Sequence, residues 1–203
     1  MKTQNFEREL PGGYKQEKYI NAKDKKFGII FNLIALAVLA VVMMLAALPL
    51  RRVDITLDFE PSEFMIVWLV FLASMIAYIV LHELVHGIAY KSLTGEKLTF
   101  GMSWSCAFCG VPSIYTYRKT ALISLVAPLT VFTVILLPLT VWLYFVNPIY
   151  YLLSAFLFGL HLGGCSGDIY CTLLFLFKFK DKKTLMRDTG PEQYFYVPLK
   201  TDE

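Results

Sequence analysis

Four long apolar segments limit what this 203-residue chain can fold into. Each exceeds the roughly 20 residues that a helix needs to cross a bilayer. They comprise residues 27–50, 64–90, 120–146 and 149–177. Charged residues make up only 17% of the chain, whereas soluble domains average about 25%. The sequence therefore predicts an all-α polytopic membrane protein with four transmembrane helices, the last two forming an antiparallel pair about the Asn147–Pro148 turn.

Basic residues flank these segments unevenly. They gather in residues 1–26, 91–119 and 178–203, whereas the loop after the first segment is mostly acidic and the Asn147 turn carries no basic residue. The positive-inside rule places such basic segments in the cytoplasm. We therefore expect a multi-pass protein of the cell membrane, with a cytoplasmic N-terminal arm (1–26), a transmembrane domain (27–177) and a cytoplasmic C-terminal tail.

The second segment ends in L-H-E-L-V-H-G, which places two histidines and a glutamate in an apolar run. His82 and His86 are four residues apart, so a helix puts both imidazoles on one face, about 6 Å apart along its axis. Glu83 lies about 100° around from His82, where it can address a metal-bound water without being a ligand. This H-E-x-x-H pattern predicts a Zn²⁺ site with Glu83 as general base. The alternative is two interfacial histidines that water or the backbone satisfies.

Zinc hydrolases of this kind use a carboxylate as third protein ligand, and Asp168 is the candidate. His82 lies nine residues before Lys91, and Asp168 lies ten before Lys178. In regular helices both would lie about 13–15 Å from a cytoplasmic helix end. The alternative is an aspartate that Ser, Tyr or water satisfies in a polar cleft.

His161 precedes Asp168 by seven residues, so a regular helix would place both on nearly the same face. His161 is a candidate accessory residue that could polarise a substrate carbonyl, hold a ligand or bind the metal. It could equally be a buried structural histidine. Small residues at every fourth position predict close helix packing beside it, and these are Gly159, Gly163 and Gly167.

The loop 97–117 alternates apolar with small or polar residues from Leu98 to Phe108. A period of two predicts a strand there, with a second strand following up to Tyr117. We expect a short membrane-associated β-hairpin whose edge pairs with an extended substrate, with Ser103 and Ser105 as candidate substrate-binding residues. The alternative is a hairpin that only closes the cytoplasmic mouth of the site.

Cys106 and Cys109 form a C-x-x-C pair, which can indicate a zinc or redox site. A second pair with that spacing is missing from the sequence, and cytoplasmic cysteines are usually reduced. A second metal or redox site is therefore the less favoured interpretation. Cys165, three residues before Asp168, is a candidate accessory ligand.

The stretches H-E-L-V-H-G and H-L-G-G-C-S-G-D resemble the putative zincin peptidase family of small bacterial membrane proteins. That family resembles the site-2 protease clan of intramembrane metalloproteases. The resemblance covers most of the chain from the second segment onward. It implies that His82 and His86 bind Zn²⁺, that Asp168 is the third ligand and that Glu83 activates water. One departure is that Asp168 is followed by Ile, where the clan has Asp-Gly.

We therefore expect a zinc-dependent intramembrane or membrane-interface peptidase acting on a membrane protein or peptide substrate in the lipid bilayer. No nucleic-acid partner is expected. Two alternatives stay open. The intramembrane histidines and Asp168 could form an ion or proton pathway in a small transporter, although the chain has no internal repeat. The chain could also be a catalytically inactive metal-binding membrane factor.

Overall fold

The computed structural model describes residues 5–51, 60–103 and 106–199. The described residues form five α-helices, one π-helical turn and seven β-strands. The chain divides into two compact units. Unit 1 comprises Met1–Phe31, Glu83–Pro128 and Gly167–Glu203, and unit 2 comprises Asn32–His82 and Leu129–Ser166.

The four predicted apolar segments are helical. The helices are α1 (Lys25–Leu50), α2 (Pro61–Thr94), α3 (Arg118–Tyr144), α4 (Pro148–Gly164), α5 (Ser166–Leu173) and the π-helical turn η1 (Leu174–Lys178). By length and composition, α1, α2, α3 and the stretch Pro148–Lys178 could each cross a membrane. The prediction of four long apolar helices is therefore confirmed.

Asn147 and Pro148 begin α4, as the turn between the last two apolar segments predicted. The side-chain oxygen of Asn147 accepts a hydrogen bond from the backbone N–H of Ile149 at 2.8 Å. Pro148 occupies the first turn of the helix, where a missing N–H leaves no bond unmade. The short connection thus stops α3 and starts α4.

The fourth apolar segment is interrupted, whereas the sequence analysis assumed one regular helix. α4 ends at Gly164, the backbone at Cys165 has φ −73° and ψ 0°, and α5 begins at Ser166. Two successive glycines, Gly163 and Gly164, weaken the helix at this point. The sequence analysis expected His161 and Asp168 to lie on nearly the same helix face. That expectation assumed an uninterrupted helix, so the break removes the reason for it.

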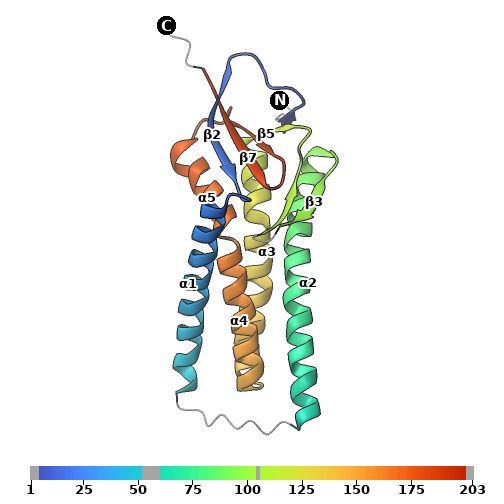
Figure 1. Ribbon diagram of the computed structural model, residues 1–203, viewed down its shortest axis with the longest axis vertical. Helices are drawn as coiled ribbons and strands as arrows, with labels where there is room; N and C mark the ends of the chain where they lie inside the picture. Colours follow the sequence, from blue (N-terminus) through green and yellow to red (C-terminus); the bar gives the residue numbers. More distant parts are fainter. Residues whose placement is uncertain (1–4, 52–59, 104–105, 200–203) are drawn as a thin grey trace. The chain divides into compact units, whose positions relative to one another are not determined.

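In unit 2, α4 packs against the other helices (Figure 1). Ala155 of α4 shares a buried cluster with Ala46 and Leu50 of α1. Phe156 of α4 meets Phe71 of α2 with ring centroids 5.5 Å apart. The core of this unit is therefore built around α4.

Two glycines of the predicted stripe allow α4 to approach α1 closely. A Cβ atom at Gly159 would lie 2.8 Å from Cδ1 of Leu39, and one at Gly163 would lie 2.7 Å from the carbonyl oxygen of Ala35. A Cβ atom at Gly167 would meet nothing within 4 Å. Gly159 and Gly163 therefore allow close packing on α1, whereas Gly167 takes no part in a close contact.

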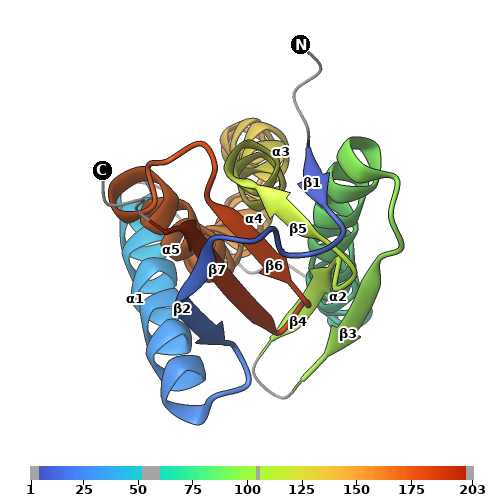
Figure 2. The same ribbon diagram turned by 90° about the horizontal axis from the view of Figure 1, so that it is seen from above.

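Unit 1 contains a five-stranded antiparallel sheet with the order β1-β5-β6-β7-β2, which Figure 2 shows from above. Its strands are β1 (Phe6–Glu7), β2 (Tyr14–Asn21), β5 (Tyr115–Tyr117), β6 (Leu185–Asp188) and β7 (Glu192–Pro198). The predicted all-α class is therefore wrong, because the N-terminal arm and the tail pair as strands. The sequence of strand β2 is mostly polar, and Ile20 is its only buried residue, so the segment resembles an unstructured arm in the sequence.

The chain between α2 and α3 contains a hairpin of β3 (Thr99–Met102) and β4 (Ala107–Gly110). It reverses direction after Ser103, whose backbone N–H donates to the carbonyl of Cys106 at 2.7 Å. The single strand predicted from Leu98 to Phe108 is therefore two strands. The residues predicted as the second strand end in β5, which joins the larger sheet.

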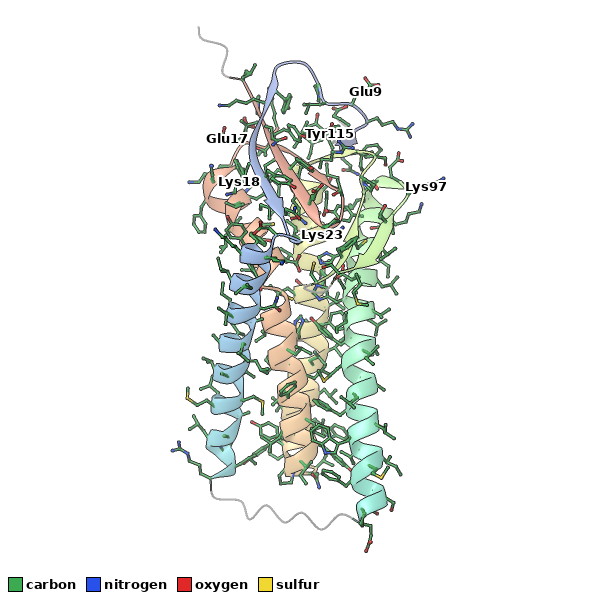
Figure 3. The ribbon with its side chains drawn as sticks, viewed as in Figure 1. Glu9, Glu17, Lys18, Lys23, Lys97 and Tyr115 are labelled. Atoms are coloured by element: carbon green, nitrogen blue, oxygen red, sulfur yellow. The ribbon has the colours of Figure 1, made fainter. Side chains whose placement is uncertain are left out.

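Strands β6 and β7 cover the core of unit 1. Met186 of β6 and Phe195 of β7 are completely buried, and they pack with Phe175 and Phe179. Charged side chains occupy the outer surface of this unit, and those labelled in Figure 3 are Glu9, Glu17, Lys18, Lys23 and Lys97.

Candidate metal centre

Helix α2 carries the H-E-x-x-H motif across the boundary between the two units. His82 ends the first segment of unit 2 and Glu83 begins the second segment of unit 1, and the helix is continuous through them. Residues four apart on one helix lie on the same face, so the continuity of α2 places His82 and His86 one turn apart. Both histidines are only 7% exposed, and Glu83 is half-buried.

In unit 1, His86 lies between two oxygen acceptors. Its Nδ1 lies 2.8 Å from the carbonyl oxygen of Ser124. A carbonyl can only accept, so Nδ1 carries the hydrogen. The other ring nitrogen, Nε2, lies 3.3 Å from Oδ2 of Asp168. The structure thus brings together His86 and the carboxylate that the sequence analysis selected as its partner ligand.

This arrangement fits a bound cation. With its hydrogen on Nδ1, a neutral imidazole presents a lone pair from Nε2. A lone pair facing a carboxylate oxygen is unfavourable unless a cation or a proton lies between them. Metal-bound histidines commonly donate their other ring N–H to a backbone carbonyl. Two imidazoles and one carboxylate are also the ligand set of many zinc hydrolases.

A buried tyrosine and aspartate, which the sequence analysis missed, lie one turn beyond His86. The hydroxyl of Tyr90 donates to Oδ2 of Asp188 at 2.7 Å, and the backbone N–H of Gly190 donates to Oδ1 at 2.9 Å. Tyr90 is four residues after His86 on α2, so they share a face. The sequence D-T-G at residues 188–190 indicates a turn after β6, but nothing in the sequence indicates that Asp188 is buried.

Burial raises the pKa of Asp188 to about 6, even though the bonds from Tyr90 and Gly190 favour the ionised form. The carboxyl group is only 5% exposed. Its hydrogen bonds hold the turn between β6 and β7 against α2. Asp188 is therefore a structural support for the end of the helix that carries His86.

The β3–β4 hairpin packs directly on α2 beside the motif. A Cβ atom at Gly87 would lie 2.7 Å from Cζ of Phe100, so the Phe100 ring occupies the space above the helix. At the far end of the hairpin, a Cβ atom at Gly110 would collide with the backbone of Gly190. Gly87 and Gly110 thus let the hairpin fit between α2 and the β6–β7 turn.

The C-x-x-C pair has no sign of metal or redox chemistry among the described residues. In the part of the chain that the structure describes, Cys106 and Cys109 form no disulfide, and neither belongs to a group of three or more side chains that could hold a metal ion. Burial, followed by the charges of Asp188 and Glu83, raises the pKa of the Cys109 thiol to about 12. A thiol ligates metal as thiolate, so this shift disfavours binding.

The candidate substrate-binding serines are only partly described. Ser103 closes the hairpin turn, where its hydroxyl lies 3.2 Å from the carbonyl oxygen of Cys106. Ser105 lies outside the described residues. A substrate-binding role for either residue stays a prediction.

His161 and Cys165 lie in unit 2 with His82. Each of the three offers one ligand atom, and these atoms lie within 4.8 Å of one another. All three side chains are buried, and His161 and Cys165 are completely so. Cys165 therefore lies beside His161. The sequence analysis had predicted it as an accessory ligand because of its position near Asp168.

A long apolar helix bearing H-E-x-x-H, with a carboxylate against its second histidine, is typical of zinc metallopeptidases. Comparison with protein families supports this class. The model of the family described as Putative zincin peptidase matches residues 75–183, more than half of the chain. The chain belongs to this family. The matched range contains the motif and Asp168. Searches of curated proteins and of solved structures gave no match.

Proposed function

We propose that this chain is a zinc-dependent peptidase of the membrane, in which His82, His86 and Asp168 hold Zn²⁺ and Glu83 is the general base. The observation that carries the proposal is the placement of His86 between the Ser124 carbonyl and the Asp168 carboxylate. Each of the three ligands offers an atom that zinc binds.

Zinc would supply a Lewis acid that makes water nucleophilic near neutral pH and polarises a peptide carbonyl. Glu83 then takes one proton from the attacking water and delivers it to the leaving amine nitrogen. A C–O bond forms as the peptide C–N bond breaks, so one water is consumed per peptide bond. The half-buried position of Glu83 suits both contact with water and partial exclusion of bulk solvent.

The distribution of charge supports a membrane setting with both termini in the cytoplasm. Of the described lysines and arginines, all except Arg51 belong to unit 1. The helices expose large apolar side chains that lipid would cover, including Leu36, Met65, Ile76 and Val134. We place the site at the cytoplasmic side, where it would act on membrane-embedded or interfacial segments in the manner of site-2 proteases.

Strand β3 is our candidate for the substrate contact. In the described hairpin, β3 pairs only with β4, and its Thr99, Phe100 and Met102 side chains are exposed. An extended peptide can add to such an edge through main-chain hydrogen bonds. We therefore place the substrate strand alongside β3, next to Gly87 of α2.

A photo-crosslinking side chain tests this placement. Met102 and Phe145 are both 79% exposed, but only Met102 lies on β3. With Glu83→Gln present to prevent turnover, a cleaved peptide should crosslink from position 102 and not from position 145. Equal crosslinking from both positions would contradict the placement of the substrate along β3.

The proposed activity is tested with the full chain, zinc and a library of single-span peptides in mixed micelles, with products read by mass spectrometry. We expect wild type to cleave members of the library and Glu83→Gln to cleave them at least about 100-fold more slowly. Glu63→Gln, at the other end of α2, is the matched control. Unchanged cleavage by Glu83→Gln contradicts the mechanism, and bound zinc without any cleavage favours the inactive metal-binding factor.

A proton or ion pathway in a small transporter is the second candidate. The observation that favours it is a row of hydrogen-bonded side chains in unit 2, formed by the buried Tyr78, His82 and His161 and the half-buried Thr133. Liposomes loaded with a pH-sensitive dye separate the two functions. A flux that survives Glu83→Gln, with no peptide cleavage, would support the transporter.

A further inference from the structure

The row of hydrogen-bonded side chains in unit 2 ends at His82, one of the proposed zinc ligands. The Tyr78 hydroxyl oxygen lies 3.0 Å from Nδ1 of His82 and 3.1 Å from Nδ1 of His161. On its other side, Nε2 of His161 lies 3.1 Å from Oγ1 of Thr133. A hydroxyl has one hydrogen, so Tyr78 can donate to only one of the two imidazoles and must accept from any imidazole to which it does not donate.

The surroundings of His161 determine the direction of these bonds. The Nε2 atom faces the Thr133 hydroxyl, whose oxygen can accept a ring N–H. By contrast, Nδ1 faces two groups that can each donate a hydrogen, the Tyr78 hydroxyl and the Cys165 thiol, whose sulfur lies 3.7 Å away. A hydrogen on Nε2 and a lone pair on Nδ1 satisfy all of these neighbours.

A neutral imidazole also suits the packing around His161. The side chain is completely buried, and aromatic rings surround it, with Phe132 and Phe158 centroids 5.8 Å and 6.2 Å from its own. Burying a charge among such side chains is costly. The neutral ring therefore carries its single hydrogen on Nε2.

We infer that Tyr78 and His161 are positioning residues for His82. His161 accepts the hydrogen of the Tyr78 hydroxyl, so the Tyr78 oxygen must accept the N–H of His82 Nδ1. That leaves the lone pair of His82 on Nε2, which is the form a metal ligand needs. The inference rests on the proposed zinc site, because it assigns the row a purpose in preparing that ligand.

Nitrogen NMR of metal-free protein tests the hydrogen positions directly. The chain contains three histidines, so ¹⁵N-histidine labelling of the full chain in micelles gives three ring systems to assign. We expect His82 to carry a hydrogen on Nδ1, and His161 to carry one on Nε2 only. A hydrogen on Nδ1 of His161, or none on Nδ1 of His82, overturns the inference.

This measurement separates the inference from the proposed function. The expected hydrogen positions with no zinc binding would contradict the zinc site and leave the positioning geometry intact. Reversed hydrogen positions with normal zinc binding would contradict the positioning role alone. Neither result depends on finding a substrate.

Zinc affinity then tests whether the row acts on the ligand. Tyr78→Phe keeps the ring and removes the hydroxyl, so we expect zinc to bind about 10- to 100-fold more weakly with unchanged stoichiometry. Tyr151→Phe is the matched control, since Tyr151 is also a buried tyrosine of unit 2. Unchanged affinity in Tyr78→Phe overturns the positioning role, whatever happens to stability.

His82, His161 and Cys165 could instead bind the metal themselves, because their ligand atoms lie close together. Cobalt substitution decides between these cases, since a thiolate bound to Co²⁺ gives an intense near-ultraviolet charge-transfer band. We expect that band to be absent from wild type. A band that disappears in Cys165→Ser would overturn the inference, and this result needs no Tyr78 variant to fold.

Discussion

Nε2 of His86 lies 3.3 Å from Oδ2 of Asp168, although the two residues come from distant helices of the sequence. The opposite ring nitrogen is held at 2.8 Å by the Ser124 carbonyl. Because that carbonyl fixes the hydrogen on Nδ1, the face toward Asp168 is prepared for a cation. This relationship links the H-E-x-x-H helix to a carboxylate without any assumption about substrate.

Ser124 tests whether its main chain, and not its side chain, supports His86. The Ser124 hydroxyl is buried and has no hydrogen-bond partner among the described residues. Removing an unsatisfied hydroxyl is close to neutral or stabilising. We therefore expect Ser124→Ala to leave zinc affinity within about twofold, as measured by competition with a chromophoric chelator. A tenfold loss would show that the hydroxyl contributes to the site.

Asp188 predicts a pH dependence of stability. Its pKa is raised from 3.8 to about 6 by burial, so between these values the folded protein binds more protons than the unfolded chain. The contribution of this group to the free energy of unfolding therefore falls as pH rises from about 4 to 6, by up to about 3 kcal/mol. Asp188→Asn should remove this slope in equilibrium unfolding in mixed micelles.

Glu9→Gln provides the control for that slope, because Glu9 is an exposed carboxylate of unit 1 (Figure 3). It should retain the wild-type dependence. An Asp188→Asn protein with the same slope as wild type would show that another group is responsible.

Gly163 predicts a packing limit between α4 and α1. An added Cβ atom would lie 2.7 Å from the Ala35 carbonyl oxygen, and backbone can yield only if the helices separate. We expect Gly163→Ala to lower the free energy of unfolding by about 1–3 kcal/mol. Gly167→Ala, where nothing lies within 4 Å, should be neutral or slightly stabilising. Equal effects of the two substitutions would argue against close helix contact at Gly163.

Gly87 and Phe100 predict coupling between the motif helix and the hairpin. Gly87→Ala would push the Phe100 ring away, since its Cβ atom would lie 2.7 Å from Cζ. We expect Gly87→Ala to reduce stability by about 1–3 kcal/mol, and Phe100→Leu to recover part of that loss in the double variant. A double-mutant cycle measures the coupling energy, which should exceed about 0.5 kcal/mol for residues in contact. If the effects of the two substitutions on the free energy of unfolding were strictly additive, the Phe100 ring would not be in contact with Gly87.

The helices and the motif were predictable because their signals are local. A run of apolar residues identifies each long helix, and the i, i+4 spacing places His82 and His86 on one face whatever surrounds them. The choice of Asp168 used the need of the motif for a carboxylate ligand, the rarity of an acidic residue in an apolar segment, and a distance from a helix end that matched that of His82. These inferences use composition and helix geometry alone.

The five-stranded sheet was not predictable in the same way. Tyr19 of β2 bonds to Glu192 of β7 across 173 residues of sequence, and such pairing leaves little local pattern. The break at Cys165 and the burial of Asp188 also depend on tertiary packing. The role of Tyr78 escaped notice because a tyrosine in an apolar helix reads as one more hydrophobic residue.

The most direct test of the central claim is the zinc content of the detergent-purified full chain, measured by elemental analysis alongside His82→Ala, His86→Ala and Asp168→Ala. We expect about one zinc per chain in wild type and its loss in all three variants, with helical content retained. That result would join the motif helix and Asp168 in one metal centre. A wild-type protein that binds no zinc when zinc is supplied, or an Asp168→Ala protein that binds it as tightly as wild type, would contradict the account.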